Sequence, residues 1–129
     1  MAYEQDYIMR QIKDMVRAIA KVATGKETPV VTLPADNKSE DSAAGIYEKL
    51  LRMADAGEIN EAENLLLESL DTGNQEHLQM ALAFYSYLNE FTGDFLEEHS
   101  YTREEIAEGI ESVSESFGLS GFGGIMTYE

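Results

Sequence analysis

Apolar residues recur at intervals of three and four along most of the chain, which is the spacing of one buried helical face. The first such segment covers residues 4–23 and contains Ile8, Ile12, Met15, Val16, Ile19, Val22 and Ala23. Thr24 and Gly25 follow it, and glycine readily takes the left-handed conformation that closes a helix. The pattern therefore predicts an amphipathic helix within residues 1–25.

Both prolines of the chain, Pro29 and Pro34, lie in the next segment, residues 26–39. A proline disfavours helical geometry at the residue before it. This segment is therefore predicted to be an extended linker, which could let the first helix pack on its own body or leave it.

Four further helices are predicted in the body of the chain. The first starts near residues 39–42 and runs to 56, the second runs from about 60 to 72, and the last two cover about 74–92 and 102–117. Gly57 ends the first of these, and Asn60 with Glu63 has the spacing of a capping box that opens the next. So short a connection forces an antiparallel helical hairpin. Thr102 with Glu105 has the same spacing at the start of the last helix.

The helix at residues 74–92 is apolar on nearly every side, and such a helix must be covered by its neighbours. We therefore expect it at the centre of the fold. One of its apolar stripes is a candidate interface and consists of Met80, Phe84, Tyr87 and Phe91.

No segment alternates in the manner of a strand, so the predicted fold is all-α: a five-helix single domain built on a helical hairpin. The predicted organisation is an N-terminal helix (1–25), a linker (26–39), an acidic helical body (40–118) and a glycine-rich, irregular tail (119–129).

With 129 residues and 43% apolar content, the chain is long enough to bury one hydrophobic core. It has no cysteine, which excludes disulfides and thiolate zinc sites and favours a reducing compartment. The charged N-terminal segment does not match a signal peptide, and no apolar window is long enough to span a membrane. We therefore expect a cytoplasmic protein.

The net charge of −16 is distributed unevenly. Residues 1–26 contain five of the nine basic residues and three of the 25 acids, so they carry +2 and residues 27–129 carry −18. A body this acidic repels phosphate backbones, which argues against nucleic acid as a partner.

The basic residues of the first helix form a narrow stripe opposite its apolar face, which we call the basic stripe: Arg10, Lys13, Arg17 and Lys21. Like charges four residues apart on a helix repel, and an acidic neighbour would relieve that cost. The neighbour could be the body of the same chain, a second copy, an anionic partner or an anionic membrane. A solvated face without a partner is an equally weighted alternative.

Signals for catalysis or cofactor binding are weak. His99 follows Asp94, Glu97 and Glu98, where a metal site is conceivable but a solvated loop is favoured, and neither it nor His77 has a nucleophile at a recognisable spacing. The glycine-rich run at 118–124 lacks the lysine of a phosphate loop. Four glutamates line one side of the last predicted helix, which is more typical of a solvated face: Glu104, Glu108, Glu111 and Glu115. We expect neither enzymatic activity nor a bound cofactor.

Two resemblances follow from short motifs. The residues Gly57, Ile59, Ala62, Leu66 and Leu70 resemble the turn and second helix of one tetratricopeptide unit, which implies close crossing of two helices. The opening YEQDYIMRQIKDMVRAIAKV, followed by an acidic helical body, resembles an uncharacterised bacterial family of small helical proteins. That resemblance implies no activity and no site.

These observations favour a non-catalytic protein–protein interaction module that self-associates, most simply as a dimer. Its candidate contact residues are Ile8, Ile12, Met15 and Ile19 on the apolar face of the first helix, together with the stripe of Met80, Phe84, Tyr87 and Phe91. The alternative is a peripheral membrane or anionic-partner adaptor that binds through the basic stripe.

Overall fold

The computed structural model describes residues 2–24 and 42–119, which fold into helices without a strand. The six helices are α1 (Ala2–Thr24), α2 (Ala43–Asp55), α3 (Ile59–Ser69), α4 (Gln75–Asn89), α5 (Gly93–Glu98) and α6 (Arg103–Ser116). The all-α class is confirmed, but the count of five is wrong because α5 is additional. This helix of six residues is too short to show a periodicity, and the Thr92 side chain caps it by accepting from the Phe95 N–H at 3.1 Å.

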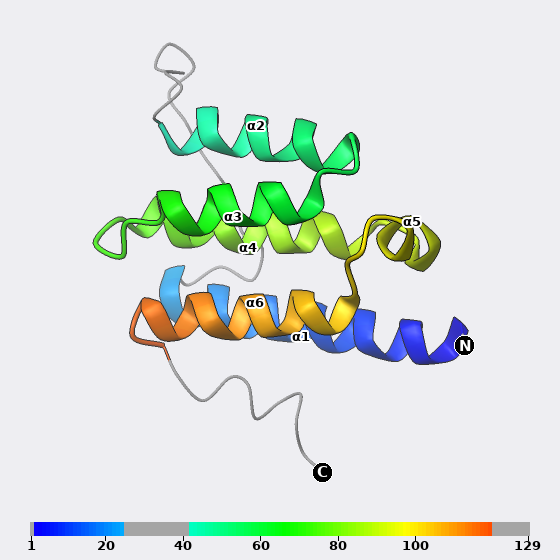
Figure 1. Cartoon of the computed structure of the whole chain (residues 1–129). Helices are drawn as coiled ribbons and strands as arrows, with labels where there is room; N and C mark the ends of the chain where they lie inside the picture. The colour runs from blue at the N-terminus through cyan, green and yellow to red at the C-terminus, as the bar shows by residue number, and fades with distance from the viewer. Residues whose placement is uncertain (1, 25–41, 120–129) are drawn as a thin grey trace.

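Helix α4 contacts α1, α2 and α6, and α2 also packs on α3 (Figure 1). The prediction that the helix apolar on nearly every side lies at the centre is therefore confirmed. It buries nine of its fifteen residues, among them the aromatic rings of Phe84 and Tyr85.

Helix α1 packs on its own body, against α4 and α6. Its apolar residues Ile12, Met15 and Ile19 are fully buried there. Side chains of α4 hold α1 at two points: Asn89 donates to the Met9 carbonyl at 3.1 Å, and Gln75 donates to the Ala23 carbonyl near the end of the helix at 2.7 Å. The helix is thus a part of the domain core.

The predicted hairpin of α2 and α3 is present, and residues 56–58 connect the two helices. Gly57 in this turn has a φ of +88°, and a Cβ atom there would lie 2.3 Å from Nε2 of His99, so the position requires glycine. The resemblance of the hairpin to a tetratricopeptide unit stays a prediction.

The predicted capping box of Asn60 and Glu63 is wrong, because the N-cap of α3 is Glu58, two residues earlier, and it makes no side-chain cap hydrogen bond. The Asn60 side chain donates to the Ser100 carbonyl at 3.2 Å, which ties the hairpin to the connection between α5 and α6. Asn60 and Glu63 have the spacing of a local cap, but their side chains instead hydrogen-bond to distant parts of the chain.

At the start of α6 the capping prediction is correct: the Thr102 hydroxyl accepts from the Glu105 N–H at 3.1 Å. Gly109 lies in the interior of this helix, where glycine is normally unfavourable. A Cβ atom at Gly109 would lie 2.5 Å from Cζ of Tyr85, so the glycine makes room for that ring between α4 and α6.

The predicted linker (26–39), the glycine run after residue 119 and most of the predicted tail lie outside the described residues.

Candidate functional site

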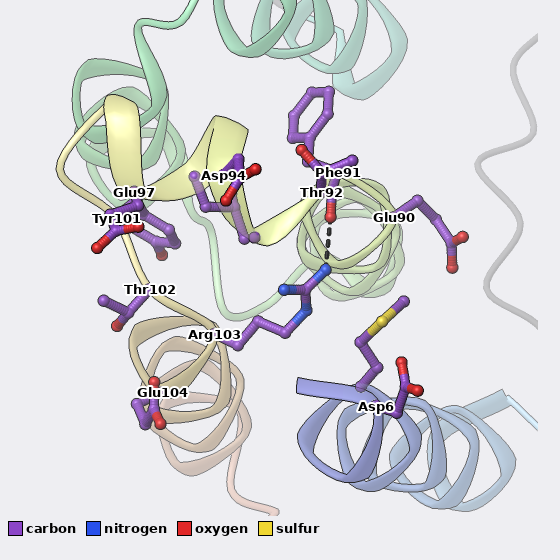
Figure 2. Close-up of a pocket in the computed structure, with 13 residues that line it drawn as sticks. Asp6, Glu90, Phe91, Thr92, Asp94, Glu97, Tyr101, Thr102, Arg103 and Glu104 are labelled. Atoms are coloured by element: carbon purple, nitrogen blue, oxygen red, sulfur yellow. Dashed lines mark hydrogen bonds between the residues drawn. The ribbon is translucent and has the colours of Figure 1, made fainter. Parts of the chain in front are cut away.

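A cleft of about 740 Å³ opens where α1, the end of α4, α5 and the start of α6 meet (Figure 2). Its lining combines carboxylates, two threonines, apolar side chains and one arginine: Asp6, Met9, Glu90, Phe91, Thr92, Gly93, Asp94, Leu96, Glu97, Tyr101, Thr102, Arg103 and Glu104. It is the candidate functional site of this domain, and we call it the acidic cleft.

Arg103 reaches across the inner side of the cleft toward the end of α4 (Figure 2). Only 3% of this residue is exposed. Its guanidinium donates to Oδ1 and the carbonyl oxygen of Asn89, at 3.3 and 3.2 Å, and to the carbonyl of Phe91. These backbone carbonyls belong to the end of α4, where no intrahelical donors remain. Arg103, the first residue of α6, therefore donates to carbonyl groups at the end of α4 that lack intrahelical partners.

Asn89 extends this network to α1 through its donation to the Met9 carbonyl. The network accounts for the burial of an arginine, which is costly unless its donors are satisfied. Burial lowers the pKa of Arg103, whereas the carboxylates of Asp6, Glu90 and Glu104 oppose that shift. The guanidinium thus retains its charge while its hydrogen-bonding capacity is used within the domain.

The carboxylates of the cleft lie on its exposed rim: Asp6, Glu90, Asp94, Glu97 and Glu104. They outnumber the single buried cation, so the cleft carries a net negative charge and attracts cationic groups. Leu96 and Tyr101 are almost fully buried behind them, and Phe91 and Met9 are partly buried. A ligand matched to this cleft has a cationic group and an apolar portion.

A second polar cluster lies beside the cleft, between α3 and α4. The Tyr85 hydroxyl donates to Oε2 of Glu63 at 2.7 Å. The Tyr101 hydroxyl is buried and has no hydrogen-bond partner among the described residues. Burial and the negative charge of Glu63 raise the pKa of both tyrosines far above 10.0. Both phenols therefore stay protonated, which suits a packed core better than proton transfer.

The apolar candidate residues of the first helix and of the helix 74–92 lie mainly in the core. Ile12, Met15, Ile19, Met80 and Phe84 are each 0% exposed. Ile8, Tyr87 and Phe91 are partly buried and pack against that core. The two predicted apolar surfaces thus cover each other inside one chain, and in this fold only their partly buried members face outward.

The basic stripe is exposed at all four positions. Nζ of Lys13 lies 3.7 Å from Oε2 of Glu90, at the rim of the acidic cleft, and the Arg17 guanidinium lies 2.9 Å from Oδ1 of Asp14. All of these side chains remain more than half exposed. The stripe therefore lies on the outer surface of α1, as its spacing predicts.

Both histidine rings contact the backbone. Nδ1 of His77 accepts from the Asp71 N–H at 3.0 Å, and Nδ1 of His99 lies 2.8 Å from the carbonyl of Phe95. Within residues 2–24 and 42–119, no group of three or more histidines and carboxylates could hold a metal ion. No helix in these ranges is long and apolar enough to cross a membrane.

The sequence reasoning above missed Arg103, although a signal for it exists. Arg103 precedes Ile106 and Ile110 by three and seven residues, so it lies on the apolar stripe of α6. A charged residue in that position marks a buried hydrogen-bond network. The cleft itself had no such signal, because its residues come from four separate helices.

Comparison with known proteins gave one family: a model described as a family of unknown function, DUF6483, matches residues 2–118. No curated protein and no solved structure matches the chain significantly.

Proposed function

The chain belongs to DUF6483, a family of unknown function. We propose that it is a non-catalytic protein–protein interaction domain that binds a basic segment in the acidic cleft. The observation that carries this proposal is the composition of the cleft: five exposed carboxylates surround an inner wall of apolar side chains.

The chemistry of the rim favours lysine or arginine side chains as the bound groups. Carboxylates at a rim act mainly on association rate and on specificity. The apolar wall near Phe91 and Leu96 can bury the methylene stems or an apolar neighbour of those residues. A short segment that alternates cationic and apolar side chains satisfies both requirements.

A fluorescent peptide of alternating arginine and leucine tests the proposal when its anisotropy is followed during titration with the protein. We expect saturable binding that weakens with added salt, because the contacts are partly electrostatic. Reversing two rim charges, Asp94→Lys with Glu97→Lys, should weaken binding at least tenfold. A peptide of alternating glutamate and leucine should not bind.

The matched control is Glu58→Lys with Glu61→Lys, two exposed positions on the α2–α3 side that change the net charge equally. It should retain most of the affinity. Equal losses in the two variants would show that the peptide responds only to net charge, and the acidic cleft would then not be the binding site.

A second candidate function rests on the exposure of the basic stripe. All four cations are exposed on α1, where Lys13 and Arg17 also have acidic neighbours in the same chain, and this surface can face an anionic protein or an anionic membrane. Co-sedimentation with vesicles of phosphatidylserine and phosphatidylcholine tests this alternative. Binding that is lost on Arg17→Glu with Lys21→Glu would support it, and absence of binding by the wild-type chain would exclude the membrane form.

A further inference from the structure

The outer surface of α1 has no covering element among the described residues, although its opposite face is fully packed. Helix α1 contacts α4 and α6 on its inner side. On its outer side lie the basic stripe and two exposed apolar side chains, Tyr7 at 57% and Val22 at 64%. Lys13, Arg17 and Lys21 follow one another at four-residue spacing and are exposed. Glu90 and Asp14 lie beside the first two, and further anionic groups would reduce the repulsion between the three cations.

The same chain presents a matching anionic surface on α6, which we call the acidic stripe: Glu104, Glu108, Glu111 and Glu115. Three of these glutamates are exposed and Glu111 is partly buried. The only basic residue of α6 is Arg103, which is buried. Among the described residues, no salt bridge reaches Glu108, Glu111 or Glu115.

The two stripes also match in length. Each one spans eleven residue steps of a helix, from Arg10 to Lys21 and from Glu104 to Glu115. At 1.5 Å per residue both are about 16 Å long. Two helices that lie side by side can therefore set the charges of one stripe opposite those of the other along their whole length.

We propose that the basic stripe of one copy docks on the acidic stripe of a second copy of this chain. The partner surfaces differ, so the contact is heterologous and can add further copies beyond a dimer. The proposal concerns α1 and α6 and is independent of whether a basic segment binds in the acidic cleft.

A second copy fits the basic stripe better than a lipid bilayer does. Peripheral helices enter a bilayer with their apolar face, and that face of α1 is buried in the core. The net charge of −16 also repels an anionic surface. Two copies repel each other as well, but at physiological salt this long-range term is screened beyond about 8 Å, whereas directly apposed stripes still attract.

Charge reversal in each stripe tests the proposal, with sedimentation velocity across a concentration series as the measurement. The first variant reverses α1 but spares Lys13, which pairs with Glu90: Arg10→Glu, Arg17→Glu and Lys21→Glu. The second reverses α6 but spares Glu104 in its first turn: Glu108→Lys, Glu111→Lys and Glu115→Lys. We expect the wild-type chain to self-associate and each variant to sediment as a monomer.

Combining the six substitutions in one chain should restore self-association, because both stripes are then reversed and the net charge equals that of the wild type. An equimolar mixture of the two triple variants should also associate. The control variant carries three reversals off both stripes and should associate at least as well as the wild-type chain: Glu58→Lys, Glu61→Lys and Glu68→Lys. Circular dichroism should show that all variants keep their helical content.

Three outcomes would overturn the proposal. The wild-type chain could remain a monomer at hundreds of micromolar, the triple variants could associate as well as the wild type, or the combined variant could stay monomeric. Binding of a wild-type monomer to phosphatidylserine vesicles through the basic stripe would assign the stripe to a membrane instead. None of these results depends on peptide binding, so the acidic cleft is tested separately.

Discussion

At the scale of single residues, Tyr85 and Tyr101 bury the same functional group in opposite ways. The hydroxyl of Tyr85 donates to Glu63 at 2.7 Å, whereas that of Tyr101 faces the same carboxylate without the geometry of a hydrogen bond. A buried hydroxyl without a partner retains its desolvation cost, and a hydrogen bond to a carboxylate contributes a net stabilisation. The hydroxyl of Tyr85 should therefore stabilise the fold, whereas that of Tyr101 should not.

Replacing each tyrosine by phenylalanine should separate these effects. Tyr101→Phe removes an unpaired polar atom, so the free energy of unfolding should stay unchanged or rise by up to about 1 kcal/mol. Tyr85→Phe removes the donor to Glu63 and should lower it by roughly 1.5 kcal/mol. Urea denaturation of both variants measures the difference, and a larger loss for Tyr101→Phe would refute this account.

The raised pKa of both tyrosines also predicts sensitivity to alkali. In the unfolded chain a tyrosine ionises near its ordinary pKa of 10.0, whereas in the folded chain both pKa values lie higher. Their contribution to stability is complete below about pH 10 and is lost as the pH rises toward the folded-state values. Each tyrosine should lower the free energy of unfolding by up to about 1.4 kcal/mol per pH unit in that range.

Urea denaturation between pH 9 and pH 11.5 checks this prediction, with the double variant Tyr85→Phe and Tyr101→Phe as the control. The control should lose stability less steeply than the wild-type chain. Parallel curves would mean that other groups control the alkaline transition.

At this scale the sequence could predict which side chains are exposed, but not which groups they hydrogen-bond to. The spacing of Arg10, Arg17 and Lys21 indicates an outward-facing stripe because exposure depends only on helical geometry. The partner of Asn60 lies in the connection between α5 and α6, and those of Arg103 lie at the end of α4, so no local spacing indicates them.

At the scale of the helices, α1 is a part of the core, and this changes what substitutions in its apolar face should do. Ile19 is 0% exposed, whereas Val22, on the same helix, is 64% exposed. Ile19→Asp should lower the free energy of unfolding by roughly 3 kcal/mol or more, because the carboxylate is buried without a partner. Val22→Asp should change it by less than about 0.5 kcal/mol. Thermal unfolding of the two variants checks the prediction, and a tolerated Ile19→Asp would mean that α1 detaches from the body.

Arg103 joins three helices, since its guanidinium binds the end of α4 and, through Asn89, holds α1 against α6. Arg103→Leu keeps much of the side-chain volume but leaves these acceptors without donors. It should lower the free energy of unfolding by roughly 2 to 4 kcal/mol. Arg103→Lys keeps the charge but cannot reproduce the planar fork, so an intermediate loss is expected. Chemical denaturation of the two variants tests this order, and an unaltered leucine variant would contradict a structural role for the network.

Helix positions were predictable wherever the signal is local. Thr102 caps α6, as its spacing with Glu105 predicts, and the apolar stripes identify α1 and α4. Helix α5 was missed because six residues are too few to show a periodicity, and the start of α3 was misassigned because Asn60 hydrogen-bonds to a distant loop.

At the scale of the whole molecule, the sequence shows the uneven charge directly, and the fold places the two signs on different surfaces. Folding places the basic stripe on the outer side of a helix whose other side completes the core. It also gathers carboxylates from α1, α4, α5 and α6 around one cleft. Surfaces of opposite sign thus lie on one domain, and this arrangement supports both interaction proposals.

The excess of acidic residues should also oppose folding, since a net charge of −16 is concentrated when the chain becomes compact. Added salt screens this repulsion, so raising sodium chloride from about 10 mM to about 300 mM should increase the melting temperature. A gain of 1 kcal/mol corresponds to roughly 3 to 6 °C for a domain of this size. Differential scanning calorimetry at a protein concentration below self-association measures the shift. The Glu58→Lys, Glu61→Lys and Glu68→Lys variant carries a smaller net charge and should show a smaller shift. A melting temperature that is unchanged or falls with salt would mean that local ion pairs, such as Arg17 with Asp14, outweigh the global repulsion.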